Sequence, residues 1–359
     1  MSIMRTKLYT MLFSCLAIFS ACEKEVEFNA PDGEAARDVT INAVAIEGEP
    51  LRVFLNRAYS VGQAPLLNIG YEYGLSNNDA LVDYLTDDYY KKTAIHDAEV
   101  KVVVNGQQNY TLALDGTSLS YTCDYRPKEG DRIEVRAEGL SVETIVPPKP
   151  RIEILDYEIL AENPYKVMNG MKYDTDTIMR IKCRIPESST GQYYRLRVRG
   201  EKKITIRDDS IAYYAYYKTQ DIFFSDDVLF ADNRLTEGFG GWPTFFSNVF
   251  NNTLIVQNGH TFIIDSPKPN INAAVQPSRT YDWEAMRQQV NEPDIPARVM
   301  VELQALSPEL YRYLKSVELF RITENDAFSE PVQIYSNVEG GWGILGALSY
   351  DRHFVEYGD

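Results

Sequence analysis

Three pairs of adjacent aspartates could do acid–base chemistry in this chain. They are Asp87-Asp88, Asp208-Asp209 and Asp226-Asp227. Two carboxylates that flank a glycosidic bond can cleave it, one as the acid and the other as base or nucleophile. The chain holds 52 acidic residues, so adjacent pairs also arise by chance. We therefore interpret them as solvated surface and predict no catalytic residue.

The histidines and two further acids do not form a metal-binding pattern. His96, His260 and His353 are far apart, and the sequence has no His-Glu-x-x-His or paired-cysteine motif, which zinc sites favour. Asp174 and Asp176 have the spacing of a calcium loop but lack its following Gly and Glu. Nucleophile-elbow and phosphate-loop motifs are missing too. We predict no metal, no cofactor and no enzymatic activity.

The thiol of Cys22 is a candidate for a different chemistry, acylation. Arg5 and Lys7 precede an apolar run from Leu8 to Phe19, and the small residues Ser20-Ala21 precede Cys22. Charge, apolar core and small residues are the parts of a secretory signal peptide. A cysteine directly after such residues resembles a bacterial lipobox. We predict cleavage before Cys22 and lipid on it; simple secretion and an uncleaved anchor are the alternatives.

The residues after the predicted cleavage site form an acidic tether. We predict that residues 1–21 are the signal peptide. Residues 22–38 are polar and acidic, and 29–36 add Pro31, Gly33 and three alanines, as flexible segments do. Glu23-Lys-Glu-Val-Glu27 resembles the surface-export signal of Bacteroidetes lipoproteins. We therefore predict display on the outer leaflet, with the periplasmic leaflet as the alternative.

Composition limits the partners and the size of the protein. The formal net charge is −16, and loss of the basic leader makes it two units more negative. This balance argues against binding nucleic acid or anionic headgroups, since both attract positive charge. With 359 residues and 44% hydrophobic content, the chain can form two domains or one large one. No later stretch has 18 consecutive apolar residues, so we expect no second membrane segment.

Two cysteines remain after the leader and Cys22 are accounted for. Cys123 alternates with Tyr121 and Tyr125, and Cys183 alternates with Ile181 and Ile185, so both lie in strand patterns. In an oxidising compartment they could form one disulfide. The other interpretation places them separately in two cores.

Residues 39–147 predict an immunoglobulin-like β-sandwich. About seven short segments alternate with period two, and turn residues such as Asn105-Gly106 separate them. The segments are Val39–Gly48, Leu51–Leu55, Ala98–Val104, Tyr110–Leu114, Ser120–Tyr125, Arg132–Ala137 and Val142–Val146. Tyr59–Thr93 interrupts this rhythm and contains one short predicted helix, Asn78–Leu85.

Residues 148–359 predict a second β-rich domain after the stiff Pro147–Pro150 boundary. Predicted strands are Ile178–Ile185, Tyr193–Arg199, Ile211–Tyr217, Thr253–Val256, His260–Ile264 and Ala297–Leu306. Ser307-Pro308-Glu309 has the order N-cap, N1, N2 and predicts a helix near the C-terminal region. The fold class is therefore all-β with one short helix.

The C-terminal stretch carries a family resemblance. Asn325-Asp-Ala-Phe-Ser-Glu-Pro331 and Tyr335-Ser-Asn-Val-Glu-Gly-Gly-Trp-Gly-Ile-Leu-Gly346 resemble the tail of family 4249 of the domains of unknown function. That family occurs in Bacteroidetes lipoproteins. The resemblance implies a surface lipoprotein, often encoded near TonB-dependent receptors, and implies no catalytic residue. Gly340, Gly341 and Gly343 in this tail predict a tight connection, with a binding loop as the alternative.

Aromatic side chains are the candidate ligand-binding residues, because sugars and peptides stack on rigid rings. They are Tyr71, Tyr73, Trp242, Phe245 and Phe246. Packing between domains is the alternative role. Asp176-Thr177-Ile178 and Asp209-Ser210-Ile211 resemble a three-residue O-glycosylation signal, which makes Thr177 and Ser210 candidate modification sites.

Together these patterns predict a non-enzymatic lipoprotein of the outer membrane, anchored by its N-terminal lipid and displayed at the cell surface. We expect it to partner a TonB-dependent receptor in nutrient uptake and to bind a glycan or peptide. A structural or adhesive envelope protein, and a hydrolase with dispersed carboxylates, are the alternatives.

Overall fold

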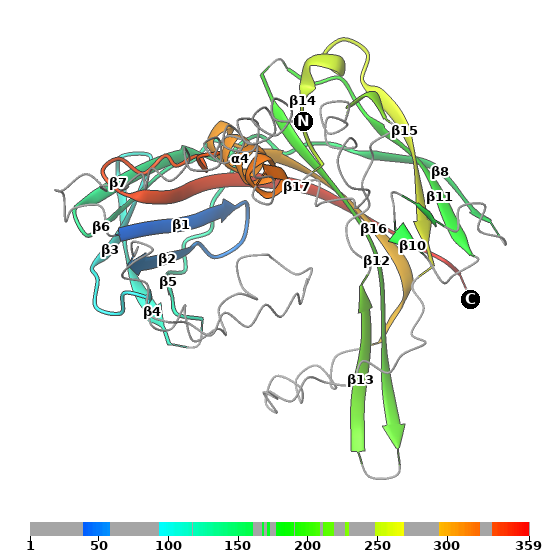
Figure 1. Ribbon diagram of the computed structural model, residues 1–359, viewed down its shortest axis with the longest axis horizontal. Helices are drawn as coiled ribbons and strands as arrows, with labels where there is room; N and C mark the ends of the chain where they lie inside the picture. Colours follow the sequence, from blue (N-terminus) through cyan, green and yellow to red (C-terminus); the bar gives the residue numbers. More distant parts are fainter. Residues whose placement is uncertain are drawn as a thin grey trace, which may run out of the picture. The chain divides into compact units, whose positions relative to one another are not determined.

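Strands dominate the described chain, as Figure 1 shows, and confirm the predicted all-β class. The computed structural model describes residues 39–57, 93–116, 118–160, 167–168, 171–172, 177–189, 191–208, 211–218, 227–229, 248–268, 294–323 and 332–358. All of them belong to one unit, Ala36–Asp359. The leader, the tether and the helix predicted at Asn78–Leu85 lie outside the described residues.

The first seven strands lie where period-two alternation predicts them. They are β1 (Val39–Ile46), β2 (Arg52–Arg57), β3 (Val100–Val104), β4 (Gln108–Asp115), β5 (Ser120–Thr122), β6 (Arg132–Ala137) and β7 (Leu140–Ile145). Asn105 and Gly106 join β3 to β4 with φ values of 55° and 68°. Positive φ at both positions is what a tight hairpin turn requires.

The later elements include the predicted helix and most of the predicted strands, one wrong prediction, and several strands that the sequence did not predict. They are β8 (Glu153–Leu160), β9 (Val167–Met168), β10 (Met171–Lys172), β11 (Ile178–Ile185), β12 (Tyr193–Asp208), β13 (Ile211–Lys218), β14 (Val249–Asn251), η4 (Asn252–Leu254), β15 (His260–Pro267), β16 (Ile295–Leu306), α4 (Pro308–Thr323) and β17 (Trp342–Glu356). The strand predicted at Thr253–Val256 is wrong. The Asn251 side chain accepts a hydrogen bond from Thr253 N at 3.0 Å and caps a 3₁₀ turn there.

One long sheet runs in the order β13-β12-β16-β17-β1-β2-β5-β4-β3-β6-β7. The last strand, β17, pairs antiparallel with β16 and parallel with β1. It therefore joins the strands before and after Pro147. The division into domains at 147/148 and the immunoglobulin-like topology of 39–147 remain predictions.

A single face of β17 contributes to two hydrophobic cores. Leu345 and Ala347 belong to the first core, with the inward residues of β1–β7. Val355, and Tyr357 directly after the strand, belong to the second core, which fills the space between β12, β16, β11 and β15. These residues are all odd-numbered, and side chains two apart in a strand share a face.

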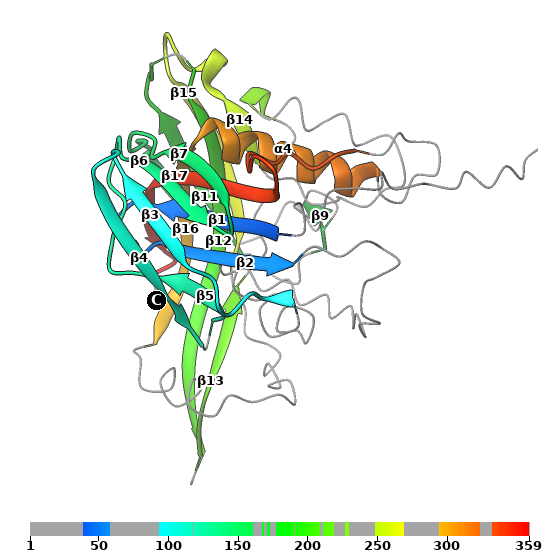
Figure 2. The ribbon, with the colours of Figure 1, turned by 90° about the vertical axis from the view of Figure 1, so that its left-hand side faces the viewer.

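Helix α4 covers part of the opposite face of β17 (Figure 2). Leu310 of α4 packs with Leu306 and Leu348 in a third, smaller core. A Cβ placed on Gly346 would come within 2.7 Å of the Leu310 Cβ, so this glycine permits the close approach of helix and strand. Farther along β17, even-numbered side chains such as Arg352 make contacts with other strands.

The glycine-rich tail forms a tight connection into β17. Gly340 and Gly343 have φ values of 75° and 109°, as the sequence predicts for positions that resist larger residues. The Asn337 side chain accepts from Leu345 N at 3.0 Å and donates to Leu345 O at 3.0 Å. It also donates to Glu143 O of β7 at 3.4 Å. The tail therefore fixes the start of β17 beside β7.

Both remaining cysteines are free thiols, so the disulfide interpretation is wrong. Cys183 is fully buried in the second core, and burial raises the pKa of its thiol to about 12. Cys123 is half-buried beside the first core, and burial raises its pKa as well. The two side chains belong to separate cores, as the other interpretation requires.

Candidate functional site

Most predicted site residues lie outside the described part of the chain. These are Cys22, Tyr71, Tyr73, Trp242, Phe245, Phe246 and Ser210. Thr177 is described: it is half-buried, directly precedes β11, and its carbonyl accepts from Lys268 N at 2.9 Å. Its glycosylation, and ligand binding by the five aromatic residues, remain predictions.

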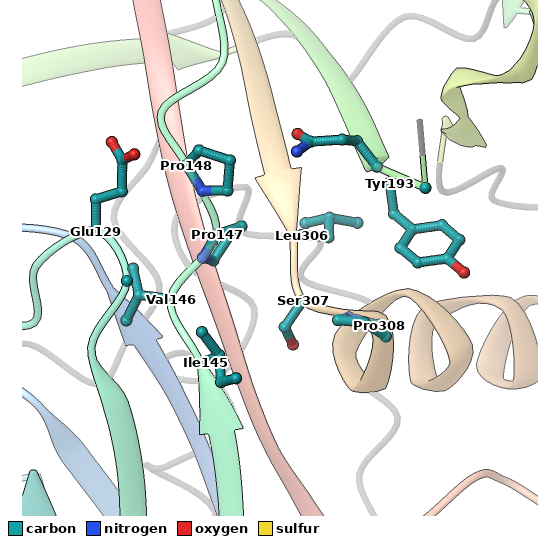
Figure 3. Close-up of a pocket in the computed structure, with 12 residues that line it drawn as sticks. Glu129, Ile145, Val146, Pro147, Pro148, Tyr193, Leu306, Ser307 and Pro308 are labelled. Atoms are coloured by element: carbon teal, nitrogen blue, oxygen red, sulfur yellow. The ribbon is translucent and has the colours of Figure 1, made fainter. Parts of the chain in front are cut away.

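The structure reveals a pocket of about 300 Å³ that the sequence did not point to. We call it the linker pocket, because residues 145–148, where β7 runs into the proline-rich linker, form one wall (Figure 3). Residues 191–193 at the start of β12 and 306–308 between β16 and α4 form the other walls. Glu129 and Gly130 complete the lining. Four segments that are distant in sequence therefore meet here.

The start of α4 is fixed by Ser307, as the N-cap pattern predicts. The Ser307 hydroxyl accepts from Leu310 N at 3.3 Å and from Ala347 N of β17 at 3.1 Å. Pro308 occupies the first helical position, where its lack of an N–H costs nothing. One hydroxyl therefore caps the helix and ties it to the sheet, which holds this wall of the pocket in place.

The proline linker is held by side chains of β17. The Ser349 hydroxyl donates to Pro148 O at 2.9 Å, and the Asp351 carboxylate accepts from Ile152 N at 2.9 Å. On the other side, the Glu129 carboxylate accepts from Lys149 N at 3.3 Å. These contacts make the linker an ordered wall.

The linker pocket combines apolar surface with the polar side chains of Glu129, Gln192 and Ser307. Tyr193 stacks on Tyr311 of α4, with ring centroids 4.3 Å apart, so its ring is held in one orientation. Pro147 and Pro148 present fixed apolar rings, as Figure 3 shows. The Glu129 carboxylate can accept hydrogen bonds. The Gln192 amide donates to Ser189 Oγ at 3.1 Å and accepts from the Tyr194 hydroxyl at 3.3 Å, which leaves it a second N–H and a second lone pair. This lining suits a sugar ring or an apolar peptide side chain.

A family comparison covers this site and nearly all of the chain. The model described as "Domain of unknown function (DUF4249)" matches residues 23–353. The chain belongs to this family. A search of curated proteins found no match. The DUF4249 match includes every segment of the linker pocket and all of the strands except the last three residues of β17, so the fold described above is that of a DUF4249 protein.

This DUF4249 chain also carries a row of charges on the α4 side of its sheet. Arg197, Glu302 and Arg352 stand directly opposite one another on β12, β16 and β17. Glu302 is completely buried; it contacts Arg197 Nη1 at 3.6 Å and accepts hydrogen bonds from Arg352. Gln304 Nε2 also donates to Glu302 at 2.7 Å. Glu302 therefore stabilises the positive charges of this row.

A histidine–aspartate pair is a further arrangement that sequence reasoning missed. His260 Nε2 lies 2.9 Å and 3.0 Å from the two carboxylate oxygens of Asp227. The imidazole also stacks on Phe262, with centroids 6.1 Å apart. The two residues are 33 positions apart, so no local motif could reveal them. The pair holds the ring of His260 in a fixed orientation.

In the described ranges, no group of three or more His, Cys, Asp or Glu side chains is placed to hold a metal ion. Among the helices that the structure describes, none has the length and apolar character of a membrane span.

Proposed function

We propose that this chain is a non-enzymatic lipoprotein of the outer membrane, displayed at the cell surface, that assists a TonB-dependent transporter in nutrient uptake. The observation that carries the proposal is the DUF4249 match, which begins at residue 23, directly after Cys22. This start supports removal of the leader before Cys22. The acids at 23, 25 and 27 support export to the surface.

A binding role is supported by the linker pocket. Tyr193, Pro147 and Pro148 give it rigid contact surface, which costs little conformational entropy on binding. Glu129 and Gln192, which line it, can hydrogen-bond to hydroxyl or amide groups of a ligand. We propose a glycan or an apolar peptide as the ligand that the protein helps to capture.

Deletion of the gene tests this function in the native host. We expect slower growth when one transported nutrient is limiting, and restoration by the wild-type chain. Complementation with Cys22→Ala is expected to fail, because the exported protein has no lipid to hold it at the membrane. Normal growth on every limiting nutrient, with altered attachment or envelope integrity, would instead favour a structural or adhesive role.

A further inference from the structure

Strand β8 has an unpaired edge among the described residues. It is the outer strand of the three-stranded sheet β15-β11-β8, and its described pairing is with β11 alone. Edge strands are usually protected by proline, by lysine or by short length. The eight residues of β8, Glu-Ile-Leu-Asp-Tyr-Glu-Ile-Leu, include no proline and no basic residue. The N–H of Tyr157 donates to Asp156 Oδ1 at 2.9 Å, a local contact that an added strand can replace. The outward N–H and C=O groups of β8 can therefore accept another strand.

One face of β8 carries apolar side chains that the core leaves exposed. Tyr157 and Ile159 stand opposite Ile181 and Met179 of β11. Ile181 and Met179 are fully buried, whereas Tyr157 is 52% and Ile159 is 45% exposed. Leu155, at the β-bulge, is 48% exposed. The second core includes Ile152 and reaches Ile154 at the start of β8, but it leaves Tyr157 and Ile159 uncovered. A strand added beside β8 would cover these exposed apolar side chains.

The other face of β8 is acidic. Asp156 and Glu158 stand opposite Lys182 and Arg180 of β11. Arg180 donates two hydrogen bonds of 2.8 Å to Asp265, its neighbour on β15. Its distance to Glu158 is 3.9 Å, and the Glu158 side chain is 61% exposed. The negative charge at the edge of the sheet is therefore only partly offset from within.

We propose that β8 is a strand-addition site for an extended segment of a partner protein in which basic and apolar residues alternate. The apolar residues would cover Tyr157 and Ile159, and the basic residues would pair with Asp156 and Glu158 across the new strand pair. A second copy of this chain fits poorly, because β8 against β8 would place acids near acids. The inference stands apart from the transporter role, since it depends only on this edge.

A peptide titration of the full mature chain tests the proposal. The probes are an eight-residue peptide of alternating lysine and valine and its counterpart of alternating glutamate and valine. We expect the lysine peptide to bind and to slow amide hydrogen exchange within 153–160, and the glutamate peptide to bind at least about tenfold more weakly because of like-charge pairs. Failure of both peptides to bind at millimolar concentration, or equal binding of both, would overturn the proposal.

Charge reversal at the edge makes the test specific. Asp156→Lys/Glu158→Lys should invert the preference, so that the glutamate peptide binds better. The milder Asp156→Asn/Glu158→Gln should abolish the preference and guards against misfolding of the first variant. The matched control is Asp97→Lys/Glu99→Lys, an exposed pair of acids with the same spacing before β3. The proposal would be contradicted if the edge variants still preferred the lysine peptide. It would also be contradicted if the wild-type chain formed a dimer that the charge reversal abolished.

Discussion

Replacing Glu302 with glutamine is expected to lower the free energy of unfolding by about 3–5 kcal/mol, the range measured when one partner of a buried ion pair is removed. Glu302 is completely buried and accepts hydrogen bonds from Arg352 and Gln304. The substitution keeps its shape but removes the charge that offsets Arg197 and Arg352. Urea denaturation followed by circular dichroism measures the change.

Glu143→Gln is the matched control for this prediction. Glu143 accepts two hydrogen bonds from Arg132, at 2.7 Å and 3.0 Å, but both side chains are more than half exposed. Exposed pairs of this kind contribute about 0.2–1 kcal/mol, so the unfolding midpoint should barely move. If the two variants lose the same free energy of unfolding, burial is not what makes the ion pairs of Glu302 strongly stabilising.

Replacing Gly343 with alanine is expected to cost about 3 kcal/mol or more, since a left-handed backbone alone costs an ordinary residue about 1–3 kcal/mol. Gly343 has a φ of 109°, and an added Cβ would lie 2.1 Å from the backbone oxygen of Ile41. The clash is with the backbone of β1, which no side-chain rotation can relieve. We expect a large fall in melting temperature, because β17 links the two main cores through β1 and β16.

Gly340→Ala separates backbone strain from this clash. Gly340 has a φ of 75°, but its added Cβ would meet only Leu140 Cδ2, at an ordinary 3.6 Å. Its cost should be about 1–2 kcal/mol, that of the left-handed conformation. If both alanine variants melt at the same temperature, the close approach of β17 to β1 is not what Gly343 provides.

The sequence predicts strands well where one face is buried and the other is exposed. β6 and β11 show this alternation, and their predicted bounds agree with the structure. β17 was missed because residues 344–349 are buried on both faces, so apolar residues follow one another without a period. β8 was missed for the opposite reason, because most of its residues are exposed on both faces.

The candidate site could not be predicted for a different reason. The linker pocket combines four separate segments, and the pairing of β17 with β1 joins residues about 300 positions apart. No local pattern encodes such pairings. The helix start at Ser307 was predictable because its capping signal is local, whereas the contact of the same hydroxyl with Ala347 was not.

Recovery of the lipidated protein from membranes in mild detergent tests the central proposal most directly. The affinity tag should follow Asp359 through a flexible linker, because Tyr357 is buried and donates a 2.7 Å hydrogen bond to Ser266 O. The proposal predicts a TonB-dependent receptor in stoichiometric amount by mass spectrometry, and its loss in Cys22→Ala. A lipidated wild-type protein recovered without any outer-membrane receptor would contradict the proposed transporter role.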